Sequence, residues 1–134
     1  MAGRTKTLAC LGAVALAAGG LAACGKEGIG VPKSSSLHHG AVLFNQHCGG
    51  CHTLDVAGTE GSATNVRDRE RVDGPNFNVR KETVPQVLYA IRNGGFSGAI
   101  MPENIVVGPD AQAIAIFLAK YAGTKATKPK SPAG

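Results

Sequence analysis

Cys48-Gly49-Gly50-Cys51-His52 is the stretch of sequence that decides the fold of this chain. One turn of backbone can present two cysteine sulfurs at this spacing to one edge of a ligand, and the histidine that follows can then point inward. Three other interpretations fit less well. A thioredoxin-like redox pair needs a strand–helix–strand context, which the flanking sequence lacks. A zinc site needs a second pair of ligands, and a disulfide between residues this close would close almost no loop.

The C-x-x-C-H pattern is the attachment signature of c-type haem. In such a site thioether bonds to Cys48 and Cys51 hold the cofactor irreversibly, and His52 binds the iron. The cysteine count agrees, because the other two of the 4 cysteines, Cys10 and Cys24, belong to an N-terminal targeting segment. The motif therefore predicts one covalently bound haem c.

Met101 is the predicted second axial ligand of the iron. It is the only methionine besides Met1, and it lies in an Ile-Met-Pro sequence well after the cysteine motif. A thioether is a soft ligand that favours ferrous iron, so His/Met ligation raises the reduction potential. The competing candidates are His38, His39 and His47. His47 lies on the wrong side of the turn, and the other two are expected to be solvated.

Apolar periodicity predicts three short helices, at 37–47, 84–92 and 108–121. Glycine follows the second and third of these stripes and is expected to end each helix. Residues 53–78 are polar, contain glycine and show no period-two alternation, so they are expected to form a loop. The predicted fold class is all-α: a small domain of short helices and long loops wrapped around one haem.

The composition supports a domain that is filled by a cofactor. The chain has 134 residues, of which 43% are hydrophobic, but it has no Trp, 2 Tyr and 4 Phe. A domain this small, with long loops, buries little apolar surface of its own. The same numbers exclude a large multidomain enzyme, a polytopic membrane protein and a disulfide-rich scaffold.

Residues 1–23 are expected to be a lipoprotein signal peptide that is removed. Arg4 and Lys6 precede the uncharged stretch from Leu8 to Leu21, which is too short to span a bilayer. The sequence Leu21-Ala22-Ala23-Cys24-Gly25 resembles a bacterial lipobox, in which the cysteine is lipidated. The alternative is ordinary cleavage near Ala22-Ala23, with Cys24 a bystander. Both interpretations predict an extracytoplasmic protein, and the first predicts one anchored to the membrane surface.

The remaining chain divides into three predicted parts. Residues 24–36 read as a flexible tether with a reach of roughly 20 Å, 37–122 as the haem domain and 123–134 as a disordered tail. The net charge of +5 comes from the ends of the chain, and the central part is close to neutral. The positive charge is therefore no indication of nucleic-acid binding.

Four features in order make the sequence resemble the class I cytochromes c of the small bacterial type. They are Gly40 and Phe44 before the motif, Cys48-Cys51-His52, Gly74-Pro75, and Met101-Pro102 before a helix with Phe117 and Leu118. The resemblance covers about 37–122. It implies that the first and last helices cross closely, with Gly40 and Phe44 against Phe117 and Tyr121. It also implies that the carbonyl of Pro75 accepts a hydrogen bond from His52.

The chain departs from the family pattern at two places. Phe77 stands where the family often has leucine, and the tryptophan that often lies near the haem propionates is absent. Tyr89 and Arg92 are candidate propionate partners, although a core tyrosine and a solvated arginine are the simpler interpretations. The charged run Arg67–Arg71 is expected to be a solvated loop, with docking of a partner as the alternative.

The expected function is that of a monomeric electron carrier and no enzyme, with a haem-bearing component of a larger respiratory oxidoreductase complex as a variant of the same chemistry. Its expected partners are membrane respiratory donor and acceptor complexes and, through the anchor, the membrane surface; nucleic acid is not among them. The alternative is a haem enzyme or small-ligand sensor in which Met101 dissociates to admit peroxide or a gas.

Overall fold

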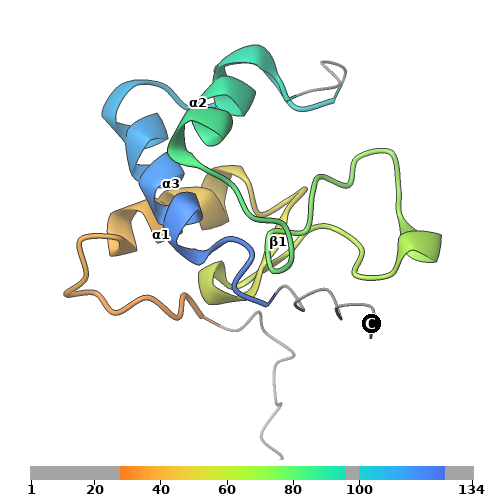
Figure 1. Cartoon of the computed structure of the whole chain (residues 1–134), viewed down its shortest axis with the longest axis horizontal. Helices are drawn as coiled ribbons and strands as arrows, with labels where there is room; N and C mark the ends of the chain where they lie inside the picture. The colour runs from red at the N-terminus through yellow and green to blue at the C-terminus, as the bar shows by residue number, and fades with distance from the viewer. Residues whose placement is uncertain (1–27, 96–99, 126–134) are drawn as a thin grey trace, which may run out of the picture.

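The computed structural model describes residues 28–95 and 100–125 of the chain (Figure 1). The predicted signal peptide and Cys24 lie outside these residues. The described part is mostly helical. Its elements in chain order are α1 (His38–His47), β1 (Thr53–Leu54), the single-turn 3-10 helix η1 (Asp55–Ala57), β2 (Thr59–Glu60), the 3-10 helix η2 (Val66–Asp68), α2 (Val84–Asn93) and α3 (Gly108–Tyr121).

The three predicted helices are confirmed, with bounds that differ by at most one residue. Local signals fix the ends of α2. The side chain of Gln86 accepts a hydrogen bond from the backbone N–H of Thr83 at 2.9 Å, and Pro85 lies in the first turn. Gly94 ends the helix in the left-handed conformation, with φ of 74°.

A small β-hairpin corrects the all-α prediction. Strands β1 and β2 pair antiparallel, with Thr53 opposite Glu60 and Leu54 opposite Thr59. Both strands have only two residues, so no alternation of apolar and polar positions could develop in the sequence. The predicted loop over 53–78 therefore contains a short sheet directly after the cysteine motif.

Helices α1 and α3 cross in close contact and form the centre of the core (Figure 1). A Cβ on Gly40 would lie 2.4 Å from the carbonyl oxygen of Ala113, so only glycine permits this approach. One turn further along α1, the rings of Phe44 and Phe117 have centroids 5.9 Å apart. Phe117 also contacts Tyr121. The crossing that the resemblance implies is present.

The segment before α1 corrects the expectation of a flexible tether over its whole length. The side chain of Val31 is only 2% exposed. The backbone N–H of Gly30 donates to the carbonyl of Val56 at 2.9 Å, and Nδ1 of His38 donates to the carbonyl of Val31 at 2.7 Å. Residues 29–36 thus pack on the domain, because Val31 buries its apolar side chain in the core.

The first residues of the predicted tail are attached to the domain as well. The backbone N–H groups of Gly123 and Lys125 donate to the carbonyls of Phe77 and Asn78, each at 2.9 Å. The ammonium group of Lys125 forms an ion pair with the carboxylate of Asp55. Residues 126–134 lie outside the described part. This C-terminal attachment holds the loop that carries Phe77.

The Lys125–Asp55 pair makes a prediction about stability and pH. A hydrogen bond from Lys125, followed by one from Asn78, lowers the pKa of the Asp55 carboxyl below its ordinary value. A carboxyl with a lowered folded pKa stabilises the fold above its unfolded pKa, and this contribution is lost as the pH falls through the folded pKa. Both partners are exposed, so Lys125→Ala should lower the free energy of unfolding by no more than about 1 kcal/mol at neutral pH.

Urea unfolding at neutral pH and at acidic pH would measure this effect. The difference between Lys125→Ala and the parent protein should shrink as Asp55 becomes protonated. Lys33→Ala, which removes an exposed lysine without an ion pair in the described residues, is the matched control. Equal destabilisation by both variants would contradict a specific contribution of the pair.

Candidate functional site

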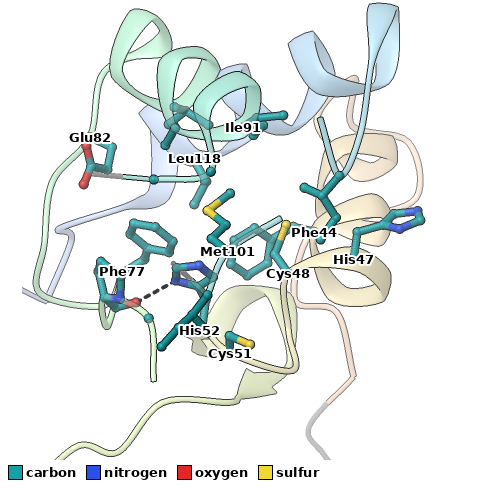
Figure 2. A pocket seen from close by; sticks show the side chains of 18 of the residues that line it. Phe44, His47, Cys48, Cys51, His52, Phe77, Glu82, Ile91, Met101 and Leu118 are labelled. Carbon is teal, nitrogen blue, oxygen red and sulfur yellow. Dashed lines mark hydrogen bonds between the residues drawn. The ribbon is translucent and has the colours of Figure 1, made fainter. Parts of the chain in front are cut away.

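A cavity of about 440 Å³ lies between the cysteine motif, α2 and the start of the segment that leads into α3 (Figure 2). Its inner wall is apolar and is built by Phe44, Phe77, Val87, Ile91, Ile114 and Leu118. The structure brings the residues predicted from the sequence to this one cavity: Cys48, Cys51, His52, Pro75 and Met101 all line it. They come from three separate segments of the chain.

The cysteine motif forms a tight turn directly after α1. The backbone N–H groups of Cys51 and His52 both donate to the carbonyl of Cys48, at 3.2 and 3.0 Å. Both thiols are free, the thiol of Cys51 being exposed and that of Cys48 half-buried. Burial, and then the neighbouring Cys51, raises the pKa of Cys48 to about 12, so this thiol is protonated at neutral pH.

His52 is held with its imidazole in the cavity. Its Nδ1 donates a hydrogen bond to the carbonyl of Pro75 at 3.1 Å, the contact that the resemblance implies (Figure 2). Burial lowers the pKa of His52, so the ring is neutral. A neutral imidazole that donates through Nδ1 keeps the lone pair of Nε2 for a metal ion.

Two further residues fix the plane of the His52 ring. The ring of Phe77 stacks on it, with centroids 4.8 Å apart and an angle of 19° between the planes. On Gly74, a Cβ would lie 2.3 Å from Cε1 of His52, so any side chain there would displace the imidazole. Neither contact could be predicted from the sequence, in which Phe77 stands out only as a departure from leucine.

Gly74→Ala is therefore expected to lower the free energy of unfolding by roughly 1–3 kcal/mol, the cost of overpacking. Because the added methyl group contacts the imidazole, the change should also disturb His52, and the visible spectrum of the purified protein would report this. Gly28→Ala, whose Cβ meets nothing within 4 Å, is the control. A Gly74→Ala protein with the stability and spectrum of the parent would contradict this description of the site.

Met101 reaches the same cavity from the segment after α2. Its side chain is half-buried, and Figure 2 shows Met101 and His52 directed into the same space, with the sulfurs of Cys48 and Cys51 to one side. The cavity thus presents one imidazole nitrogen, one thioether and two thiols.

The competing histidines do not offer this arrangement. His38 donates to the carbonyl of Val31, and Nε2 of His39 lies 3.0 Å from the carboxylate of Asp110 on the surface. His47 is exposed at the rim, and its ring points away from the cavity in Figure 2.

The donor set fits a haem c. Among the described residues, no group of three or more His, Cys, Asp or Glu side chains could hold a metal ion by itself. One imidazole and one thioether bind iron in proteins when a porphyrin supplies the four remaining nitrogen ligands. Apolar walls accommodate the ring, and two thiols at one side can bond to it.

The cavity lining also carries charged side chains that were not predicted to be there: three arginines, besides the acidic Asp73 and Glu82. Arg69, Arg71 and Arg80 line the cavity. Glu82 is buried, at 7% exposure, and its carboxylate pairs with Nε of Arg80 at 2.5 Å. The candidates Tyr89 and Arg92 are absent from the lining.

The run Arg67–Arg71 is exposed to solvent, as predicted, and two of its arginines also line the cavity. Arg80 comes from a different segment, so only the folded chain brings the three together.

No helix in the described ranges combines the length and the apolar character needed to cross a bilayer.

Comparisons with known proteins found few matches. No family model matches the chain, and no curated protein matches it. Among solved structures, it is similar to the crystal structure of the c-type cytochrome SorU from Sinorhizobium meliloti. The two chains are 27% identical, the match covers 66% of this chain and 92% of that one, and the TM-score is 0.47.

Proposed function

We propose that this chain is an extracytoplasmic electron carrier that holds one covalent haem c with His52 and Met101 as axial ligands. The observation that carries the proposal is the convergence of four side chains on one apolar cavity: the two thiols of Cys48 and Cys51, the imidazole of His52 and the thioether of Met101. When bound there, the haem would supply a one-electron Fe(II)/Fe(III) couple.

The surroundings of His52 favour electron transfer over catalysis. Its imidazole is fixed by the hydrogen bond to Pro75, by the stacked ring of Phe77 and by the backbone at Gly74. A ligand held on three sides moves little when the charge of the metal changes. If His52 and Met101 both hold the iron, no position would remain on it for a substrate.

The arginines in the cavity lining would receive the carboxylates of the haem. Guanidinium groups bind carboxylates with charge-assisted hydrogen bonds. Arg80 is already oriented by Glu82, and its other N–H donors have no partner among the described residues. Arg69 and Arg71 lie on the same cavity lining.

A redox titration of the purified holoprotein, followed by its visible spectrum, tests the proposal. A reversible one-electron couple with a low-spin, six-coordinate spectrum in both oxidation states is the expected result. High-spin iron in the resting protein, or rapid binding of carbon monoxide to the reduced protein, would favour the alternative of a haem enzyme or gas sensor.

The proposal includes a lipid anchor at Cys24, which would keep the carrier beside membrane respiratory donor and acceptor complexes. Cys24→Ser is expected to release the protein from the membrane fraction of cells. Cys10→Ser, which changes a cysteine inside the predicted signal peptide, is the control and should leave the fractionation unchanged. Continued association of Cys24→Ser with membranes would contradict lipidation.

A further inference from the structure

Two backbone hydrogen bonds fix the chain on either side of Met101: one closes the end of α2, and the other joins the segment after Met101 to α2. The N–H of Gly95 donates to the carbonyl of Ala90 at 2.9 Å, which closes the helix end. On the far side of Met101, the N–H of Asn104 donates to the carbonyl of Ile91 at 2.8 Å.

Both contacts depend on residues in the left-handed conformation. Gly94 has φ of 74° and Asn104 has φ of 53°. Among the described residues, Asn104 is the only one besides glycines with a positive φ. Asparagine tolerates this conformation better than most residue types.

Gly94 also touches the Met101 segment directly. A Cβ at Gly94 would lie 2.7 Å from the carbonyl oxygen of Met101 and 3.3 Å from Cγ of Glu103. At Gly95 the corresponding atom would lie 3.7 Å from Sδ of Met101, an ordinary contact. The backbone of Met101 therefore rests against the Cα of Gly94, and no larger residue could occupy that position without moving it.

We propose that Gly94 and Asn104 form a clamp that positions the thioether of Met101 and so determines how firmly it stays on the iron. This inference rests on the proposed function. A ligand on a loop is effective only when the backbone that carries it is held in place. Gly94 and Asn104 are positioning residues, because they act on Met101 and do not reach the cofactor.

The first test compares Gly94→Ala with Gly108→Ala in the holoprotein. Gly108 also has positive φ, 61°, but a Cβ there meets nothing within 4 Å. Both variants place alanine at a positive φ, which destabilises the fold, but only the methyl group of Gly94→Ala would clash with the backbone of Met101. Gly94→Ala should retain covalent haem and weaken the red absorption band that a thioether gives with ferric haem.

The same variant should bind carbon monoxide more tightly in the reduced state. The apparent affinity rises with the fraction of protein in which Met101 has left the iron, so we expect this affinity to increase about tenfold or more. Gly108→Ala should match the parent protein in both measurements.

A second pair of variants keeps the test decisive if Gly94→Ala fails to fold. Asn104→Gly accepts positive φ and should retain the red band, whereas Asn104→Val, β-branched, should weaken it. Hydrogen exchange of the residue-104 amide gives a readout independent of the haem. Exchange should be slow in the parent and in Asn104→Gly, and faster in Asn104→Val.

Two outcomes would separate this inference from the proposed function. An intact band and an unchanged carbon monoxide affinity in Gly94→Ala and in Asn104→Val would overturn the clamp, provided that Met101→Ala loses the band. If Met101→Ala itself leaves the spectrum unchanged, Met101 is no ligand, and the proposed ligation fails together with the clamp.

Discussion

Replacing both Cys48 and Cys51 by serine is expected to abolish covalent attachment of haem. Serine cannot form a thioether, and the described residues contain no other cysteine that could replace these two. Any haem in the double variant would be held only by His52, Met101 and the apolar wall. Acidified organic solvent should then extract the pigment completely, whereas the parent protein should retain it. Haem staining of a denaturing gel measures this.

The two single variants test whether each cysteine forms its own bond to the haem. Cys48→Ser and Cys51→Ser should each retain one covalent bond and therefore stain on the gel. Cys24→Ser alters a cysteine outside the motif and should stain like the parent protein. A double variant that still stains would show that the pigment is attached elsewhere and would remove the basis of the proposed function.

The second large effect is expected for Met101→Ala. Covalent haem should remain, because the thiols and His52 are unchanged, but the iron loses its soft ligand. The reduction potential should fall by something on the order of 0.1 V or more, within the range of about 0.8 V that axial ligands span. The reduced protein should also bind carbon monoxide readily. Redox titration and carbon monoxide binding measure these two changes.

Met101→His tests whether the reduction potential depends on the chemical type of the sixth ligand or only on its presence. An imidazole at this position should restore six-coordinate, low-spin iron while leaving the potential low. Val107→Ala, a change at an exposed side chain outside the cavity lining, is the control for the segment. If Met101→Ala keeps the parent potential and spectrum, the sixth ligand is another residue.

The elements that could be predicted from the sequence are those that local signals determine. The helix α3 has an apolar stripe, Pro109 in its first turn and Gly123 directly after its C-cap, so its bounds agree with the prediction. One short motif predicts that the side chains of Cys48, Cys51 and His52 serve the same ligand, and all three line the cavity. Met101 was identified because few alternatives exist in so short a chain.

The remaining features depend on contacts between distant segments. Val31 lies in a run rich in glycine, serine and lysine, and only the apolar core beneath it explains its burial. The strands of the hairpin have two residues each, too few for an alternation of apolar and polar positions to show in the sequence. The stacking of Phe77 on His52 requires the turn at Gly74-Pro75, which brings together residues 25 positions apart in sequence.

The buried side chain of Val31 also bears on how the carrier would search for its partners. If Cys24 carries lipid, five peptide steps separate it from Ile29, a fully extended length of roughly 17 Å. The near side of the domain could therefore rise no more than roughly 17 Å above the bilayer, so the carrier would meet its redox partners by lateral diffusion along the membrane.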